Sequence, residues 1–362
     1  MEEQAIRFTA DGGRRIAWAR SGSGPPLVLA GWWMTDLELN WREPRFRAFV
    51  DTLGRHRTVI RYDPPGTGLS ADGTEPAAAD LEQETAALAA VVEAADAGPV
   101  DLFAGSSGAP IGIAFAAAHP DRVRRLLAYG GYASGAKIAD ARSRQAIVDL
   151  VRGHWGLGSR ALADVFIPSA TAAEREEFVA FQRQAASAER AARSLEAVYR
   201  FDVADRLEKA PHGAVVLHRR EDRAIPFELG RELAAGLPGA TFVALDGDDH
   251  FPWFGDAAQF SGAAFDALGI EEAPESSAPS ALASEPEPEP ERDAQPLAVS
   301  ELTRRETEVL TMVANGLSDR EIADRLVLSP HTVHRHVANV RTKLGLPTRA
   351  AAVAAAAKRG LL

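Results

Sequence analysis

The sequence predicts an α/β fold with a doubly wound, mostly parallel sheet and a helical cap, followed by a small all-α domain of four helices. Three observations lead to this prediction. Over the first 270 residues, short apolar runs alternate with helical segments, which is typical of parallel strands joined by crossover helices. An acidic, Pro-rich stretch then interrupts the chain. Residues 298–362 carry the start and stop signals of four short helices.

The strands are predicted from short runs rich in Val, Leu and Ile. Ahead of them, residues 5–22 have the pattern of an antiparallel hairpin that turns at Asp11, Gly12 and Gly13. An Ala- and Arg-rich helical insertion, about 133–205, separates two strands, and we expect it to cap the carboxyl edge of the sheet. The predicted strands are 26–30, 58–63, 100–104, 125–130, 214–218 and 241–245.

Charge divides the chain into three parts. The whole chain of 362 residues carries a formal charge of −11, of which residues 1–270 carry −8. Residues 271–297 hold eight acidic residues against one Arg, and we predict a disordered acidic linker there. Residues 298–362 hold ten Lys and Arg against six Asp and Glu, a net of +4. An acidic body with a small basic end favours a DNA-binding module attached to another domain.

Composition excludes several classes of protein. The chain has no Cys, which excludes disulfides, zinc-thiolate sites and iron–sulfur clusters. It shows no N-terminal signal pattern and no apolar run near the ~20 residues that span a bilayer. We therefore expect a cytoplasmic protein that contacts no membrane, and we predict neither a metal nor a cofactor.

The stretch DLFAGSSGAP, residues 101–110, carries a candidate nucleophile. A predicted strand ends there, a helix begins, and Ser106 lies between Ala104 and Gly108 in a small-x-Ser-x-small pattern. A sharp strand-to-helix turn needs small neighbours two residues to either side of the serine. It would place the hydroxyl group at a helix N-terminus, which favours developing negative charge.

With these motifs, residues 1–270 resemble the α/β-hydrolase family. Supporting runs are AGWW after the strand at 26–30, RYDPPGTGLS at 61–70, EDRAIP at 221–226 and GDDHFPW at 247–253. The resemblance implies a catalytic triad of Ser106, Asp222 and His250. It also implies an oxyanion hole formed by the backbone N–H groups of Trp32 and Ser107.

Other interpretations of these residues stay open at this point. Asp222 has Arg219, Arg220 and Arg223 beside it and could simply form a surface ion pair, while His250 lies next to two aspartates. Some members of this fold bind ligands without turnover. Three hypotheses follow: a transcription regulator with a ligand-sensing or ligand-cleaving domain, a serine esterase with an accessory tail, and a receptor without turnover.

The tail is predicted to form helices at about 304–314, 319–326, 330–344 and 348–359. In the third, Val333, Val337, Val340 and Leu344 form one apolar stripe that should pack inward. The opposite face and its flank carry basic and amide groups suited to phosphates and base edges in a major groove. Those positions are His331, His334, Arg335, Ala338, Asn339, Arg341 and Thr342.

Residues 298–362 resemble the LuxR/FixJ-type helix-turn-helix domain in the runs LTRRETEVL, GLSDREIADRL and SPHTVHRHVANVRTKLG. The resemblance implies that His334, Arg335 and Ala338 read bases. It assigns phosphate contacts to Thr332, Asn339, Arg341 and Lys343. The partners predicted for the whole protein are double-stranded DNA, a small ester, lactone or other acyl ligand, and a second copy of the chain.

Overall fold

The computed structural model describes residues 4–71, 80–271 and 304–314, with single positions beyond them at 322, 325, 326, 333, 336, 337, 340 and 343. The chain divides into two compact units, Met1–Ser277 and Ala278–Leu362. The predicted acidic linker, apart from Glu271, lies outside the described residues. Within the described ranges, no helix is long and apolar enough to cross a bilayer.

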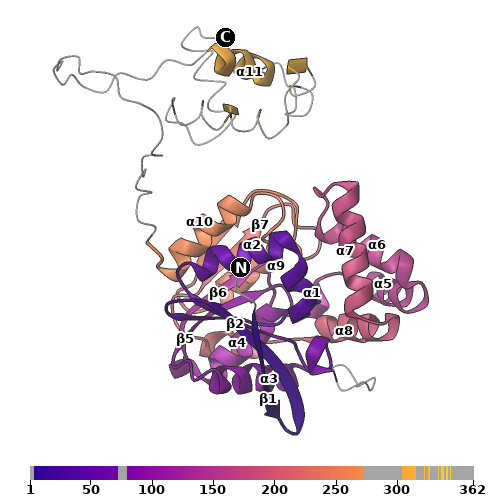
Figure 1. Cartoon of the computed structure of the whole chain (residues 1–362), viewed down its shortest axis with the longest axis vertical. Coiled ribbons are helices and arrows are strands. Elements are labelled where there is room, and N and C mark those ends of the chain that lie inside the picture. The colour runs from indigo at the N-terminus through magenta and orange to yellow at the C-terminus, as the bar shows by residue number, and fades with distance from the viewer. Residues whose placement is uncertain are drawn as a thin grey trace, which may run out of the picture. The chain divides into compact units, whose positions relative to one another are not determined.

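The first unit is built on one eight-stranded sheet with the order β1-β2-β4-β3-β5-β6-β7-β8 (Figure 1). Strands β1 and β2 form the predicted hairpin, β2 also pairs antiparallel with β4, and the other pairs are parallel. The prediction of a mostly parallel sheet is thus confirmed. The strands are β1 (Ala5–Asp11), β2 (Arg14–Gly22), β3 (Pro26–Leu29), β4 (Thr58–Tyr62), β5 (Val100–Gly105), β6 (Val123–Tyr129), β7 (Val215–Arg219) and β8 (Thr241–Leu245).

Helices cover both faces of this sheet, which makes it doubly wound. One face packs against α3 (Leu81–Ala94), α4 (Gly108–Ala118) and α9 (Phe227–Gly236). The other face packs against α2 (Pro44–Gly54), which follows the short α1 (Leu37–Arg42), and against α10 (Ala257–Leu268). Because strand residues alternate between the faces, neighbouring Val28 and Leu29 enter different cores.

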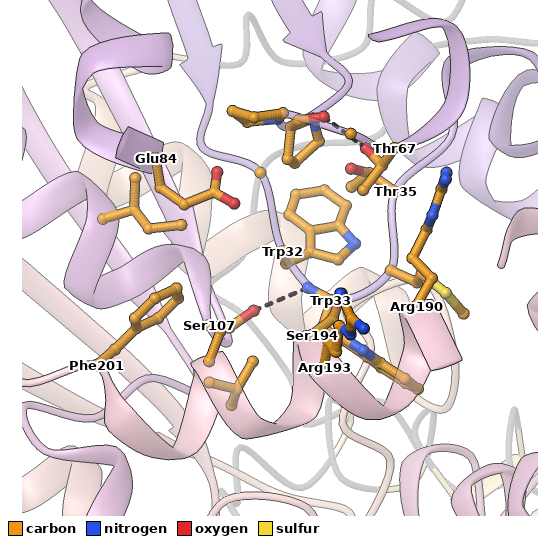
Figure 2. A pocket seen from close by; sticks show the side chains of 18 residues that line it. Trp32, Trp33, Thr35, Thr67, Glu84, Ser107, Arg190, Arg193, Ser194 and Phe201 are labelled. Carbon is orange, nitrogen blue, oxygen red and sulfur yellow. Dashed lines mark hydrogen bonds between the residues drawn. The ribbon is translucent and has the colours of Figure 1, made fainter. Parts of the chain in front are cut away.

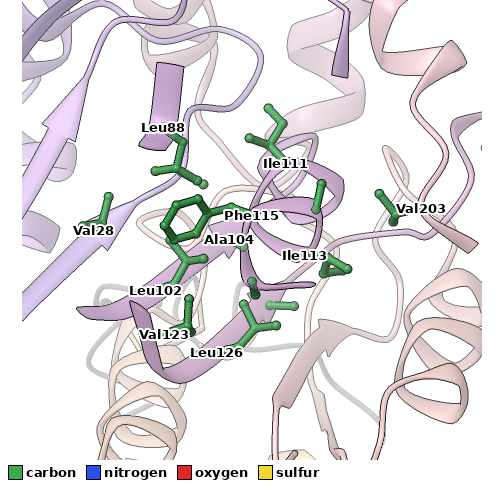
Figure 3. Packing of buried hydrophobic residues seen from close by; sticks show 14 of the residues in the cluster. Val28, Leu88, Leu102, Ala104, Ile111, Ile113, Phe115, Val123, Leu126 and Val203 are labelled. Atoms are coloured by element: carbon green, nitrogen blue, oxygen red, sulfur yellow. The ribbon is translucent and has the colours of Figure 1, made fainter. Parts of the chain in front are cut away.

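The central strands are apolar throughout because both of their faces are covered. Figure 3 shows the core beneath α3 and α4, where Leu88 and Phe115 meet Val28 and Leu102 of the sheet. Each of these side chains is at most 2% exposed. This packing fixes the start of α4 against the end of β5, where the candidate nucleophile lies.

The insertion between β6 and β7 is helical. Its helices are α5 (Ala141–Gly153), α6 (Trp155–Phe166), α7 (Ala172–Ala185) and α8 (Ala188–Arg200), which lie together beside the sheet (Figure 1). The two ends of the insertion meet, since the Val203 N–H group donates to the Ala133 carbonyl group at 2.8 Å. Ser134 and Asp202 form a bridge at the same place. The chain therefore leaves the sheet for the four helices and returns to it at the same place, where these contacts hold the two ends of the insertion together.

The second unit contains α11 (Arg304–Ala314), which matches the predicted first helix of the tail. Val309 and Val313 of α11 pack against Ile322, Val333 and Val337. Val340 is also buried. The predicted inward stripe of the third tail helix is thus confirmed at 333, 337 and 340, whereas Leu344 lies outside the described residues.

Candidate active site and DNA-binding segment

The turn between β5 and α4 holds Ser106 in a left-handed backbone conformation, with φ of +54°. Outside glycine this conformation is uncommon and costs energy, so the surroundings must hold it in place. The Ser106 N–H group donates to the Tyr129 carbonyl group of β6 at 2.8 Å, and Ala109 N–H donates to the Ser106 carbonyl group at 3.0 Å. The serine side chain is thereby turned away from the strand, and it is partly exposed.

The small residues around the serine are required by close packing. A Cβ atom on Gly108 would lie 3.0 Å from the carbonyl oxygens of both Ala30 and Gly31. On the other side, Ala104 has a methyl group where the family pattern often has glycine. Room for it comes from Gly112 of α4, whose own Cβ would lie 2.7 Å from the Ala104 Cβ. One methyl group fits between this strand and helix, and two would not.

Ser106, His250 and Asp222 form one continuous hydrogen-bonded row. The Ser106 Oγ atom lies 2.7 Å from His250 Nε2, and His250 Nδ1 lies 2.8 Å from Asp222 Oδ2. The three residues follow β5, β8 and β7, whose carboxyl ends share one edge of the sheet. With its proton on Nδ1, the imidazole donates to the carboxylate and accepts from the serine hydroxyl group. This arrangement can activate the hydroxyl group as a nucleophile.

The Asp222 carboxylate is ionised despite its burial. Burial alone would raise the pKa of Asp222, but the neighbouring His250 and His218 hold that pKa well below its usual range. The Oδ1 atom also accepts from the backbone N–H groups of Ala224 and Ile225, at 2.8 and 3.1 Å. A fixed negative charge at this position favours the protonated imidazole that forms when Ser106 loses its proton.

The neighbouring arginines have partners other than Asp222. Buried Arg219 donates to the carbonyl groups of residues 249, 251 and 254, at 2.7 to 3.2 Å. Arg223 pairs with Asp248 at 3.0 Å, and Arg220 lies 3.7 Å from Asp246. The surface ion pair considered as an alternative is therefore not what holds Asp222.

Two residues that support this row were not recognised from the sequence. His218 of β7 is fully buried, with Nε2 2.9 Å from the Ile225 carbonyl oxygen and 3.5 Å from Asp222 Oδ2. Phe166, at the end of the cap helix α6, stacks on the His250 ring at a centroid distance of 5.6 Å. The Phe166 carbonyl group also accepts a hydrogen bond from the backbone N–H group of His250 at 2.7 Å. The position of His250 therefore depends on the cap as well as on the sheet.

The loop after β3 lies next to the serine turn. The Ser107 Oγ atom accepts a hydrogen bond from the Trp33 N–H group at 2.8 Å, which ties this loop to the start of α4 (Figure 2). The backbone N–H groups of Trp32 and Ser107, predicted as the oxyanion hole, form no hydrogen bond within the described part of the chain. The sequence had assigned a role only to the main chain of Ser107, and the structure adds one for its hydroxyl group.

Among the cavities that adjoin this site, two matter for its chemistry. A small one of about 220 Å³ contains Ser106 and His250 among aromatic walls that include Trp32, Tyr129 and Trp253. A larger one of about 660 Å³ lies between the core and the cap helix α8, and it reaches Ser107 but not Ser106 (Figure 2). Trp32 lines both cavities. Within the described residues, no group of His, Asp and Glu side chains has the arrangement of a metal site.

Most of the predicted DNA contacts, namely His331, Thr332, His334, Arg335, Ala338, Asn339 and Arg341, lie outside the described residues. Lys343 is described, and its ammonium group lies 2.7 Å from the buried Glu306 carboxylate of α11. This ion pair joins the first and third helical segments of the tail. The resemblance to LuxR/FixJ-type domains implies a phosphate contact for Lys343, whereas its contact with Glu306 has no signal in the sequence.

Family models match both parts of the chain. Residues 27–263 match the model described as alpha/beta hydrolase family, so the chain belongs to the alpha/beta hydrolase family. Residues 300–356 match the model described as bacterial regulatory proteins, luxR family. The protein thus joins an α/β-hydrolase domain to a LuxR-type helix-turn-helix DNA-binding domain.

Individual relatives resemble one part or the other. Pimeloyl-[acyl-carrier protein] methyl ester esterase of Xanthomonas campestris is 30% identical over 66% of this chain and 92% of its own length. A Mycobacterium tuberculosis protein named as an HTH-type transcriptional regulator, Rv0890c, is 49% identical over 16% of this chain. The chain spans half or less of the length of several curated relatives that it matches, and 7% in the case of Rv0890c.

Among solved structures, the enol-lactonase of Burkholderia xenovorans LB400 superimposes with a TM-score of 0.60 at 25% identity. The match covers 73% of this chain and all of the lactonase chain. The shared architecture is that of the first unit.

Proposed function

We propose that this protein is a transcription regulator whose α/β-hydrolase domain binds and hydrolyses a small ester, lactone or related acyl compound. The observation that carries the proposal is the hydrogen-bonded row from Ser106 through His250 to Asp222, with separations of 2.7 and 2.8 Å. The strained serine turn and the buried, ionised Asp222 support the same chemistry.

The proposed reaction proceeds in two halves. The Ser106 Oγ atom attacks the carbonyl carbon while its proton passes to His250 Nε2, and Asp222 stabilises the resulting imidazolium. The N–H groups of Trp32 and Ser107 hold the negatively charged oxygen of the tetrahedral intermediate. The imidazolium then protonates the leaving alkoxide as the carbon–oxygen bond breaks. A water molecule hydrolyses the acyl-serine by the same route in reverse, with His250 again accepting the proton.

The surroundings of Ser106 favour a small, uncharged acyl group. The cavity that contains the serine is about 220 Å³ and is lined mainly by aromatic side chains. Such walls bury hydrocarbon or aromatic surface and provide no counter-charge for an ionic acyl group. Two similar proteins are named as a methyl ester esterase and an enol-lactonase, and these names refer to ester-type substrates and support this class.

The DNA-binding domain gives the hydrolase domain a regulatory role. We propose that the protein binds DNA as a dimer in the cytoplasm, with one tail on each half of a two-fold site. A ligand can change this state only if it binds the two arrangements with different affinity. The cap is a suitable element for such a difference because it contacts His250 through Phe166.

The enzyme hypothesis is tested with para-nitrophenyl butyrate. We expect the full-length protein to turn over this ester and the Ser106→Ala variant to lose at least about a thousandfold in kcat/KM. Ser21→Ala, in the hairpin, is the matched control and should keep full activity. Equal hydrolysis by the wild type and Ser106→Ala would refute the role of Ser106.

The second candidate is a receptor that binds its ligand without turnover. One observation favours it: the larger cavity reaches Ser107 but not the Ser106 hydroxyl group. Wild-type protein that binds an ester stoichiometrically but leaves it intact would select this candidate over the enzyme.

The DNA-binding assignment is tested separately. Arg335→Ala should abolish protection of a specific promoter site in a footprinting assay, because a bidentate Arg contributes ~1–3 kcal/mol of base discrimination. Arg359→Ala, at the end of the predicted last helix, serves as the control with the same change of charge. An unchanged footprint for Arg335→Ala would refute the assignment of the recognition helix.

A further inference from the structure

The larger cavity, about 660 Å³, has the features of a binding site in its own right (Figure 2). Its walls come from the loop after β3, the loop after β4, the helices α3 and α4, and the cap helix α8. Most of the lining is apolar, including Trp33, Met34, Ile111 and Phe201. Polar side chains, among them Thr35, Glu84 and Arg190, are set into this apolar lining, and such a combination is typical of small-molecule sites.

Glu84 stands out in this lining because its ionisable side chain is buried. Glu84 of α3 is 9% exposed, and its Oε2 atom has no hydrogen-bond partner within the described protein. Its carboxyl group points into the cavity, while the side chains of Arg190 and Arg193 lie on the opposite side (Figure 2). The buried Oγ1 atom of Thr35, in the same lining, also has no partner among the described residues.

Among the described residues, no close cation neutralises Glu84. In the described part of the chain, Glu84 forms no ion pair. Burial raises the pKa of Glu84 to about 8, and the more distant charges of Arg14 and Asp80 act in opposite directions. The neighbouring Tyr62 phenol has a raised pKa as well and stays neutral. Leaving a buried carboxyl group unsatisfied is costly, which points to a partner beyond the described residues, and the open cavity beside Glu84 has room for a bound ligand.

The chemistry of this oxygen selects the partner. When Oε2 carries a proton it must donate, and when it does not it must accept. A carboxamide satisfies both states, because its carbonyl group accepts and its N–H group donates. An ester can only accept, and an ammonium group can only donate. The apolar walls suit a hydrocarbon or aromatic body attached to that head group.

We propose that this cavity binds a small, uncharged molecule with an apolar body and a carboxamide head group, held at the α3 end by Glu84. The inference rests on the proposed ligand-binding role of the α/β-hydrolase domain, and it adds a second ligand in a cavity whose lining does not include Ser106. The bound molecule contacts α3 and α4 of the core together with α8 of the cap. It also lies against Trp32 and Ser107, whose N–H groups are assigned to the oxyanion hole.

The test measures binding by calorimetry to the full-length Ser106→Ala variant, so that no probe is hydrolysed. The probes are phenylacetamide, methyl phenylacetate and phenethylamine, which share one apolar body. With a Glu84 pKa of about 8, the affinity for the ester should fall about tenfold between pH 6 and pH 9. The affinity for the amide should change less than twofold, because the amide satisfies both protonation states.

Second-site variants separate this role from a structural one. Adding Glu84→Gln to the Ser106→Ala variant keeps a donor and an acceptor at this position. The affinities for the amide and for the ester should therefore both become independent of pH. Adding Glu84→Leu should remove the preference for the amide at pH 9. The control is Glu93→Leu, at an exposed position of the same helix, and it should leave both affinities unchanged.

Several results would overturn the proposal: no binding of any probe, tightest binding of phenethylamine, or an amide preference that survives Glu84→Leu. Ester turnover by the wild type is measured separately, so failure of this inference and failure of the proposed function are distinguishable. An intact amide preference without turnover would retain the site and remove the enzyme. Turnover without an amide preference would retain the enzyme and remove the proposed carboxamide site.

Discussion

Replacing Glu84 with Gln should change how the stability of the first unit depends on pH. In the folded protein, burial raises the pKa of Glu84 to about 8, from 4.5 for an unperturbed glutamate. Because the folded pKa is the higher one, the protonated side chain is tolerated at low pH. Stability is then lost as the pH rises from the unfolded pKa through the folded pKa.

The size of the effect follows from these two pKa values. Between pH 5 and pH 7 Glu84 is mostly ionised in the unfolded chain, whereas the folded chain keeps most of its proton, so each pH unit lowers the free energy of unfolding by up to ~1.4 kcal/mol. The free energy of unfolding of the wild type should therefore fall by about 2 kcal/mol over this interval from Glu84 alone. The Glu84→Gln variant lacks that contribution, and all other titrating groups are common to both proteins.

The assay is denaturant unfolding of the full-length protein followed by tryptophan fluorescence. All six tryptophans lie between Trp18 and Trp253, so the signal reports on the first unit alone. The gap between the variant and the wild type should widen by about 2 kcal/mol from pH 5 to pH 7. The control is the Glu93→Gln variant, whose free energy of unfolding should depend on pH as that of the wild type does. A gap that stays constant for Glu84→Gln would refute the argument that burial suppresses ionisation of Glu84.

Three further predictions concern the serine site. Asp222→Asn should lower kcat on para-nitrophenyl butyrate by about 10³–10⁴, since the amide favours the wrong imidazole tautomer; activity within tenfold of the wild type would contradict this role. Ser107→Ala removes the acceptor of the Trp33 N–H group and should lower kcat about tenfold, whereas an unchanged kcat would show that this tie is dispensable. Gly108→Ala should destabilise the first unit by ~1–3 kcal/mol in fluorescence-monitored unfolding, because its methyl group meets two carbonyl oxygens. The Gly262→Ala variant, whose added methyl group lies in open space on α10, should keep the stability of the wild type. Equal stabilities of the Gly108→Ala and Gly262→Ala variants would contradict the packing argument.

Much of the first unit could be predicted from the sequence because its signals are local. Buried parallel strands appear as continuous apolar runs, and the run at 100–104 corresponds to β5. Neighbouring parallel strands end at one edge of the sheet, so residues after β5, β7 and β8 are brought together by topology. That is why Ser106, Asp222 and His250 could be named before their distances were known.

The supporting residues could not be predicted because they depend on packing between distant segments. Phe166 reaches His250 across 84 positions in the sequence, from a cap helix whose placement no local pattern encodes. Glu84 has the sequence context of an ordinary polar residue early in a helix, next to Glu82, and only the tertiary structure buries it. The ion pair of Lys343 with Glu306 was missed for the same reason, because both residues also fit an exposed helix face.

The most direct test of the whole account is whether Ser106 is a nucleophile activated by His250. Incubation with diethyl para-nitrophenyl phosphate should transfer one diethylphosphoryl group to the Ser106 oxygen, with release of para-nitrophenolate and the proton taken by His250. Intact-mass and peptide analysis should find a single adduct on the peptide that contains Ser106, and none in Ser106→Ala or His250→Ala. An unmodified wild-type protein, or equal labelling of the Ser106→Ala variant, would contradict the claim that this serine is chemically activated.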